Sequence, residues 1–253
     1  MPLDVQNASS ELAPHRPLTE FYEAPAERAH FVGDLFDRAA PDYNWLSGAL
    51  SFWTDRQYRK HALRKAGLQP GMRVLDVASG TGLVAQGALD LGVPPRDLVG
   101  LDPSRGMLQE NRKERSVSLI QGFGERLPFC AAAFDFISMG YALRHVEDLG
   151  KLFREFYRVL RAGGRILILE ITRPSSRPGF ALMRFYMQKL VPFLTRLSRR
   201  HDEAARLVEY YWATIAECVL PEVILGALKK AGFSDVARKT TGNILSEYVG
   251  TKS

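Results

Sequence analysis

The segment from Val74 to Leu83 constrains the fold of this 253-residue chain more than any other stretch. It reads Val-Leu-Asp-Val-Ala-Ser-Gly-Thr-Gly-Leu, so a short apolar run leads through two glycines into a helical pattern. Gly80 and Gly82 allow the backbone to approach a ligand where a side chain would collide. The following helix presents free N–H groups and the positive end of its dipole. With Asp76 near the strand end, this segment predicts a pocket for a ligand that carries adenosine.

Strand signals recur along the chain at intervals that suit βαβ units. We expect seven strands, at residues 73–78, 98–101, 117–120, 134–139, 165–170, 236–240 and 245–250. Helical patterns occur between them at residues 82–91, 105–115, 149–160 and 223–231. Alternation of this kind predicts an α/β fold, in which helices cover both faces of a mostly parallel sheet. The last two strands are separated at Gly242 and Asn243, which favours an antiparallel hairpin at the sheet edge.

Three segments lie outside this alternation. Residues 1–30 begin with scattered proline, asparagine and serine, and we expect a flexible N-terminal arm. Residues 31–70 predict N-terminal helices, the first ending near Pro41 because the residue before a proline is disfavoured in a helix. Residues 173–221 hold long helical patterns rich in aromatic side chains, methionine and arginine. We interpret them as a helical substrate lid, with ordinary helix packing as the alternative.

Composition narrows the class of protein only coarsely. The hydrophobic content of 46% is typical of a globular chain, and no apolar run reaches the roughly 18 residues of a membrane span. Residues 1–23 lack the apolar block of a secretory signal. Two cysteines, Cys130 and Cys218, are too few for a disulfide framework, so the cytoplasm is the expected compartment. The net charge of +6 suits an anionic membrane surface, nucleic acid or an ordinary solvated surface.

Asp102 follows Gly82 by 20 residues and ends the second expected strand. In this topology a carboxylate at that place can accept hydrogen bonds from both hydroxyls of a ribose. Asp102 is also placed to cap the helix that begins after Pro103, and both roles can hold together. No spacing of His, Cys and Asp is typical of a metal site, so we expect none.

Later motifs narrow the ligand. The segments Leu127-Pro128-Phe129 and Arg158–Gly164 are not dinucleotide signatures, and they resemble motifs of class I S-adenosylmethionine-dependent methyltransferases. Four further segments resemble the ubiquinone/menaquinone-biosynthesis C-methyltransferase family more closely, namely Phe36–Tyr43, Ser51-Phe52, Leu143–Val146 and Leu169–Pro174. The resemblance covers residues 31–240, and it makes residues 31–253 one methyltransferase domain.

The resemblance implies a Rossmann-like sheet of seven strands with an antiparallel last strand, S-adenosyl-L-methionine as cofactor, and a quinol or other apolar or aromatic acceptor. Asp102 would hold the ribose, Met107 would pack on the adenine ring, and Tyr43 would close over the site. The cofactor-binding residues that it implies are Tyr43, Asp76, Ala78, Ser79, Gly80, Thr81, Gly82, Asp102, Met107, Gly124 and Glu125.

Three residues after the fourth expected strand are the catalytic candidates. Methylation of a phenol carbon requires loss of the phenol proton, and transfer from a pKa of ~10 to a free histidine at ~6.5 costs roughly 5 kcal/mol. A neighbouring cation lowers this cost, which is the role expected for Arg144, and His145 is the candidate base. His145 could equally cap the next helix or face solvent, and Tyr141 could be core or a pocket wall.

The chain departs from the family pattern at several of these positions. Ala78 stands where the family usually has glycine, and Leu83 where it usually has an acid. Phe123 and Gly124 replace a usual pair of Asn or Asp and Ala, so the side chain expected to meet the adenine amino group is absent. His145 replaces an asparagine. The expectation of a sulfonium cofactor is therefore firmer than that of a quinol acceptor.

Other functions stay open at this point. Within methyltransferases, the acceptor could be a secondary metabolite methylated on O, N or C. An NAD-dependent oxidoreductase is a further alternative, with Ala85 at the place of its third glycine, and so is a non-catalytic subunit that binds an adenosine cofactor. Nucleic acid is not an expected partner, because Met139-Gly140-Tyr141 stands in place of an Asn/Asp-Pro-Pro-aromatic motif. Peripheral contact with a membrane and a homodimer are options that the sequence leaves open.

Overall fold

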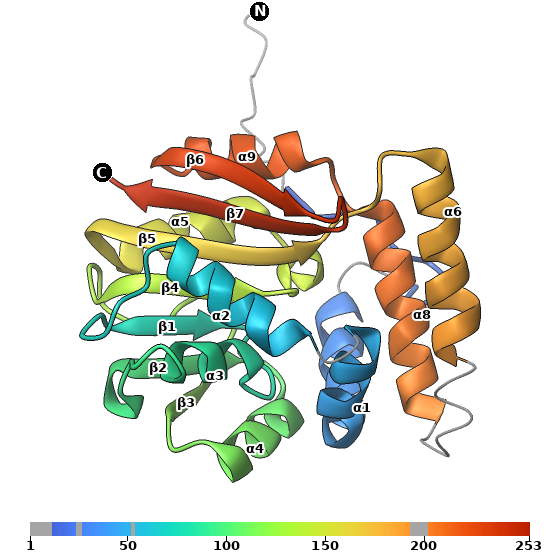
Figure 1. Ribbon diagram of the computed structural model, residues 1–253, viewed down its shortest axis with the longest axis horizontal. Coiled ribbons are helices and arrows are strands. Elements are labelled where there is room, and N and C mark those ends of the chain that lie inside the picture. The colour runs from blue at the N-terminus through green and yellow to red at the C-terminus, as the bar shows by residue number, and fades with distance from the viewer. Residues whose placement is uncertain (1–11, 24–26, 52–53, 193–201) are drawn as a thin grey trace, which may run out of the picture.

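The computed structural model describes residues 12–23, 27–51, 54–192 and 202–253, and it shows a seven-stranded sheet with the order β3-β2-β1-β4-β5-β7-β6 (Figure 1). Strand β7 runs antiparallel to β5 and β6, whereas the pairs among β1 to β5 are parallel. The strands are β1 Val74–Val77, β2 Leu98–Asp102, β3 Ser118–Gln121, β4 Phe134–Gly140, β5 Leu160–Ile171, β6 Phe233–Thr241 and β7 Leu245–Lys252. The predicted fold class, seven strands and terminal hairpin are confirmed.

Helices cover both faces of the sheet. Helices α2 (Asp55–Lys65) and α3 (Leu83–Leu89) pack on one face, and α5 (Leu149–Val159) and α9 (Pro221–Lys230) pack on the other (Figure 1). All four residues of β1 are buried: Val74 faces the α2–α3 core, while Leu75 and Val77 face the α5–α9 core. A strand covered on both sides is apolar throughout, which is why residues 74–77 read as a continuous apolar run around one aspartate.

Further helices stand beyond the carboxyl ends of the parallel strands (Figure 1). These are α1 (Arg28–Leu50), α6 (Arg177–Phe185), the π-helix η4 (Tyr186–Leu190) and α8 (Asp202–Glu217). They share a third apolar core that includes Leu35, Met183, Met187 and Leu207. In the described part of the chain, the remaining elements are α4 (Arg105–Glu114) and the short 3-10 helices η2 (Pro95–Asp97) and η3 (Leu143–His145). Residues 173–192 and 202–221 are thus mainly helical as expected, residues 193–201 lie outside the described ranges, and the role of this segment as a lid stays a prediction.

Helix α1 does not end near Pro41, so that prediction is wrong. Proline fits a helical φ, but it removes its own N–H bond and its ring crowds the carbonyl four residues earlier. Residues buried on both sides of Pro41, including Leu35 and Leu46, nevertheless hold the helix in place. Because Pro41 has no N–H, the carbonyl of Asp37 lacks the donor that it would have in a regular helix. That oxygen lies 2.8 Å from the place of a Cβ at Gly106, so glycine is required where α4 approaches.

Residues 12–23 do not form a flexible arm, because apolar side chains anchor them. Leu18 and Tyr22 are buried in the core shared by α1 and α8. The Leu149 N–H donates to the carbonyl of Leu12 at 2.9 Å, and the Val219 N–H donates to that of Pro14 at 2.8 Å. The prediction of a loose arm over residues 1–30 is wrong for 12–23 and for the start of α1; residues 1–11 and 24–26 lie outside the described ranges.

Within the described ranges, no single helix combines the length and the apolar character needed to cross a membrane. Residues Ala205–Glu217 and Pro221–Lys230 meet the criterion only together, as a pair bent by 77°.

Candidate active site

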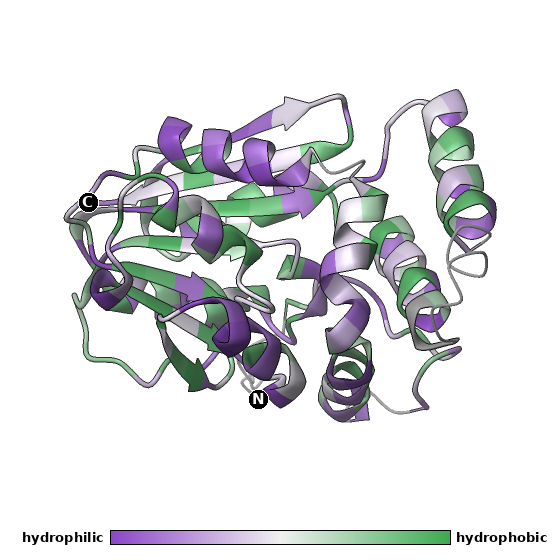
Figure 2. Ribbon diagram, turned by 60° about the horizontal axis from the view of Figure 1, so that its bottom comes forward, coloured by the Kyte–Doolittle hydropathy of each residue, from purple (hydrophilic) through white to green (hydrophobic). Residues whose placement is uncertain are grey.

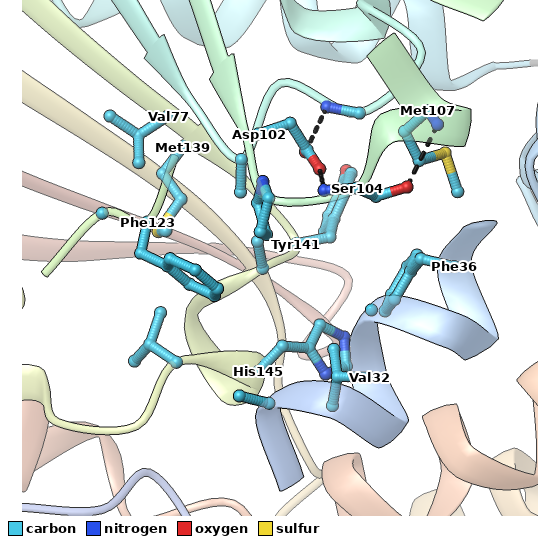
Figure 3. A pocket seen from close by; sticks show the side chains of 18 of the residues that line it. Val32, Phe36, Val77, Asp102, Ser104, Met107, Phe123, Met139, Tyr141 and His145 are labelled. Carbon is cyan, nitrogen blue, oxygen red and sulfur yellow. Dashed lines mark hydrogen bonds between the residues drawn. The ribbon is translucent and has the colours of Figure 1, made fainter. Parts of the chain in front are cut away.

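A cavity opens at the carboxyl ends of β1, β2 and β4 (Figure 3). This is the point where the strand order changes direction around β1, and open α/β sheets bind ligands at such a point. The empty space, including the solvent at its open mouth, is about 860 Å³. Helix α1 forms the wall that faces the strand ends, through residues that include Val32, Phe36 and Tyr43.

The loop between β1 and α3 presents its backbone to this cavity. Gly80 has a φ of 53°, and a Cβ built on it would meet nothing within 4 Å, so the glycine leaves free space beside the loop. Gly82 has a φ of 85°, and a Cβ there would lie 2.4 Å from Oδ1 of Asn111. Ala78 also has a left-handed φ, of 52°. A position of this kind favours glycine, which agrees with the glycine that the family resemblance implies there.

Asp102 joins this loop to the next strand. Its Oδ2 accepts a hydrogen bond from the Gly80 N–H at 2.7 Å, and its Oδ1 accepts one from the Ser104 N–H at 2.8 Å. The carboxylate is buried in the cavity wall, and burial raises the pKa of Asp102 to about 6. Each carboxylate oxygen has a second lone pair, so Asp102 can still accept bonds from two ligand hydroxyls. The helix-capping role expected for Asp102 belongs to Ser104, whose Oγ accepts from the Met107 N–H.

Asp76 lies behind the cavity wall. Its Oδ1 accepts from the Ser138 hydroxyl at 2.7 Å, while its Oδ2 is buried without a partner. Burial raises the pKa of Asp76 to about 7. Thr81 is held from the side of α1, where its hydroxyl donates to Asn44 at 2.5 Å. Of the expected cofactor residues, those that line the cavity are Tyr43, Ala78, Gly80, Asp102, Met107, Gly124 and Glu125, and those that do not are Asp76, Ser79, Thr81 and Gly82.

His145 lies on the side of the cavity opposite Asp102 (Figure 3). Its ring stacks on Tyr210 and Tyr211 of α8, at centroid distances of 5.3 and 5.8 Å, and meets the ring of Phe36 edge-on at 5.3 Å. Both ring nitrogens are buried, and neither has a hydrogen-bond partner among the residues that the structure describes. Burial, and then the charge of Arg144, holds the pKa of His145 well below its ordinary value. The imidazole is therefore neutral and lacks a partner at the cavity wall.

Arg144 points away from the cavity. Its guanidinium forms a buried ion pair with Glu170 at the end of β5 and donates from Nε to the Thr214 hydroxyl at 3.2 Å. It also lies 5.0 Å from the centroid of the Tyr211 ring. The sequence predicted a cation facing the acceptor, whereas Arg144 is not among the lining residues and Glu170 balances its charge. The geometry thus corrects the expectation of a direct contact.

Tyr141 forms part of the cavity wall at the end of β4, with a φ of 59°. Its hydroxyl donates to Oδ1 of Asp55 at 3.3 Å, and the guanidinium of Arg59 lies 4.9 Å from its ring centroid. Burial raises the pKa of Tyr141 well above its ordinary value, so the phenol stays neutral. Sequence reasoning missed Asp55 and Arg59, because Arg59 sits among surface lysines and arginines in a polar helix that gives no sign of one buried cation.

Phe123 contributes an aromatic side chain to the cavity wall. Its side chain is 53% exposed and lines the cavity, next to Gly124 (Figure 3). A Cβ at Gly124 would lie 2.6 Å from a methyl group of Leu152, so a larger residue there would require that side chain to shift. Met107, on α4, supplies another apolar wall. The cavity thus combines an acceptor for a diol, a bare glycine backbone and apolar walls for a flat ring, which suits adenosine. Within the described ranges, no group of three or more His, Cys, Asp or Glu could hold a metal ion.

A comparison with known families decides the assignment. The model of the ubiE/COQ5 methyltransferase family matches residues 23–252, which is nearly the whole chain. The chain belongs to this family. It is therefore a methyltransferase, its cofactor is S-adenosylmethionine, and its acceptor is an apolar small molecule.

Two relatives show how far the similarity extends. A demethylmenaquinone methyltransferase of Beutenbergia cavernae is 33% identical over 225 residues, covering 88% of this chain and 91% of that protein. A ubiquinone/menaquinone biosynthesis C-methyltransferase of a Geobacter species (strain M21) is 32% identical over 237 residues, covering 90% and 99%. Among solved structures, an S-adenosylmethionine-dependent methyltransferase from Thermotoga maritima superposes with a TM-score of 0.61 at 20% identity, covering 87% and 99%. That last likeness shows the shared fold.

Proposed function

We propose that this ubiE/COQ5 family member methylates a ring carbon of a prenylated quinol. The observation that carries the proposal is the neutral, unpartnered imidazole of His145 in an apolar cavity wall, opposite the buried carboxylate of Asp102. One side of the cavity thus suits a ribose, and the other suits a single hydroxyl on an aromatic ring. The names of the relatives at 33% and 32% identity support a quinol as that ring.

The cofactor site follows from the lining residues. Asp102 would accept bonds from the ribose hydroxyls, with Met107 and Phe123 on the apolar faces of the adenine. The backbone of Ala78 and Gly80 would lie along the methionine part, and Tyr43 would cover it from α1. Gly124 and Glu125 complete this wall, while Asp76, Ser79, Thr81 and Gly82 shape the loop from behind.

The protein contributes mainly alignment to the reaction. When bound, S-adenosylmethionine supplies an electrophilic methyl group on a sulfonium. Good positioning of an acceptor is worth effective molarities of about 10⁵ M or more. Phe36 and Tyr141 form walls that exclude water from the acceptor, and neutral His145 accepts a hydrogen bond from one ring hydroxyl, which fixes the orientation of the ring.

His145 acts in this proposal as a hydrogen-bond acceptor more than as a strong base. Proton transfer from a free phenol to a free imidazole costs roughly 5 kcal/mol, and the lowered pKa of His145 increases that cost. Protonation is disfavoured further because Arg144 and Arg28 both lie near the ring. The phenol proton therefore leaves to water at the open mouth of the cavity, and the imidazole holds the oxygen in place meanwhile. The hydrogen on the methylated ring carbon then leaves as a proton and the oxygen regains one, so each methyl transfer releases one proton in total.

Arg144 is a positioning residue in this account. Its pair with Glu170 ties η3 to β5, and its carbonyl accepts a bond from Nη2 of Arg28 at 2.9 Å. These contacts fix the turn that carries His145. The two helices of the lid region, α6 and α8, would cover the acceptor. An enzyme that methylates a prenylated quinol is expected in the cytoplasm, in contact with the membrane surface. We expect no nucleic-acid partner, and the enzyme would work as a monomer or a homodimer.

Transfer of an isotope-labelled methyl group tests the proposal. The protein is incubated with ¹³C-methyl S-adenosylmethionine and a reduced quinone that carries a short prenyl tail and a free ring position. We expect one labelled methyl on the ring carbon, recognised by its NMR shift, and none with the oxidised quinone. A label on oxygen, or none in any quinol, would contradict the proposal.

A variant connects that reaction to its site. His145→Phe keeps an aromatic ring in the stack with Tyr210 and Tyr211 but removes both nitrogens. We expect turnover to fall by about 10²-fold, in line with the loss of one preorganised hydrogen-bonding group, while affinity for S-adenosylhomocysteine is unchanged. Phe129→Leu, remote from the cavity, is the matched control for an aromatic change. Equal turnover of His145→Phe and wild type would remove His145 from the mechanism.

A further inference from the structure

Three apolar side chains project from the outer face of α6 and η4. Leu182 is 71% exposed, Phe185 58% and Leu190 37%. Residues three apart share one side of an α-helix, and the wider turn of a π-helix brings the fifth residue onward to the same side. We name Leu182, Phe185 and Leu190 the lid ridge.

The opposite face of these helices is buried, and packing against the rest of the protein fixes the helices that carry the ridge. Met183, Met187 and Val191 pack in the core shared with α1 and α8. The Tyr186 hydroxyl donates to the carbonyl of Leu50 at 3.1 Å. Figure 1 shows α6 as the outermost helix, on the far side of α8 from the sheet, and Figure 2 shows apolar and polar residues alternating around it. A helix that is apolar on two sides is normally covered on both.

Exposed basic residues lie on the same helices as the ridge. Arg177, Arg184 and Lys189 are exposed on the same two helices. From Arg173 to His201 the sequence contains seven arginines and lysines and no aspartate or glutamate. Since the whole chain has a net charge of +6, all of its positive excess lies in this segment, and the remainder sums to −1.

We infer that the lid ridge docks on an anionic lipid bilayer. Leucine and phenylalanine on an exposed helical face insert into the boundary between headgroups and acyl chains, while arginine and lysine beside them bind anionic headgroups. The reason for such docking rests on the proposed function, because a prenylated quinol dissolves in the bilayer. Docking through the lid places the covering helices at the surface from which such an acceptor enters.

A second copy of the chain is a poorer occupant of this face. A twofold contact through the ridge would place the same surface of both copies together. Arg184 and Lys189 of each copy would then face their counterparts, with no carboxylate between residues 173 and 201 to offset the repulsion. Anionic lipid supplies the missing negative charge.

Sedimentation with vesicles tests the inference on the full-length chain. Vesicles of phosphatidylcholine alone are compared with vesicles that contain phosphatidylglycerol. We expect the wild type to bind the anionic vesicles at least tenfold more tightly. Two variants, Leu182→Ser/Phe185→Ser/Leu190→Ser and Arg184→Glu/Lys189→Glu, should each lose at least tenfold of that binding.

Matched controls lie on α9 and at its N-cap, Leu220. Leu220 is 69% exposed, almost the same as Leu182, and Lys229 and Lys230 are exposed like the cations of the ridge. Leu220→Ser and Lys229→Glu/Lys230→Glu should leave vesicle binding within twofold of the wild type. Equal losses in the ridge and control variants, or wild-type binding by the ridge variants, would overturn the inference. The inference would also be overturned if the wild type bound no vesicles and light scattering showed a dimer that the ridge variants abolish.

The failure of this inference can be distinguished from failure of the proposed function. Affinity for S-adenosylhomocysteine and turnover of a detergent-dissolved quinol should be unchanged in the ridge variants. If those variants keep full turnover on quinol embedded in anionic vesicles, the ridge has no docking role. If no quinol is methylated but vesicle binding depends on the ridge, the docking surface stands and the acceptor is a different lipid-soluble molecule.

Discussion

At the scale of single residues, Asp102 links the cofactor cavity to pH. Burial raises its pKa to about 6, so the carboxylate is ionised at neutral pH and becomes protonated as the pH falls through that value. The protonated form loses acceptor capacity for the ribose and for the Gly80 and Ser104 N–H groups. Ligand binding favours the ionised form, so cofactor affinity should fall on the acid side.

Calorimetry with S-adenosylhomocysteine measures this effect. Because one unit of pKa difference corresponds to a factor of ten in binding, we expect about tenfold weaker binding near pH 5 than near pH 7.5. Asp102→Asn should bind more weakly at neutral pH and show a much flatter dependence. If the variant has the slope of the wild type, another buried acid, such as Asp76 with its pKa of about 7, is responsible.

A substitution at Ala78 should stabilise the protein. Its φ of 52° is a left-handed conformation that disfavours any residue with a Cβ. Ala78→Gly should therefore increase the free energy of unfolding by about 1 kcal/mol, after the entropy that glycine adds to the unfolded chain is deducted. Urea unfolding measures it, with Ala181→Gly in α6 as the control that should destabilise by about 0.5–1 kcal/mol. A lower unfolding midpoint for Ala78→Gly would show that the loop does not hold this conformation.

At the scale of elements, the buried pair of Arg144 and Glu170 joins η3 to β5, and Thr214 adds α8 to the same junction. Removing one partner of a buried ion pair leaves an uncompensated charge, which costs about 3–5 kcal/mol. Glu170→Gln should lower stability by about that amount, seen as an earlier midpoint in urea, whereas Glu222→Gln at the exposed start of α9 should change it little. Similar midpoints for the two variants would mean that the junction contributes no net stability.

Elements were predictable from sequence where a local pattern decides them. The strand and helix positions between Val74 and Lys252 follow from periodicity and glycine placement, and the structure reproduces them to within a few residues apart from an earlier start of β5 and β6. Pro41 was misleading because packing on both sides of it overrides its local preference. Residues 12–23 were misjudged because their anchors, Leu18 and Tyr22, contact helices far along the chain.

The sequence predicted only some features of the candidate site correctly. Gly80 and Asp102 have roles that follow from short-range chemistry, and both line the cavity. Arg144 was misjudged because its direction depends on Glu170 and on α8, more than 60 residues further on. The unpartnered nitrogens of His145 depend equally on Tyr210 and Tyr211. Contacts between distant segments give no periodic signal in the sequence.

At the scale of the whole molecule, three cores meet at the cavity: one on each face of the sheet and one among α1, α6 and α8. The sheet carries the cofactor loop and Asp102, and the helical layer carries the aromatic rings around His145. The central claim is that the two ligands meet at this junction, with the cofactor on the sheet side and the acceptor against the helices.

Crystals grown with S-adenosylhomocysteine test that claim most directly. We expect electron density for the ligand in the cavity, with both ribose hydroxyls within hydrogen-bonding distance of the Asp102 carboxylate and the adenine between Met107 and Phe123. The sulfur should face the wall that carries His145. Density for the ligand elsewhere, for example in the groove between η4 and α8, or a ribose turned away from Asp102, would contradict the account.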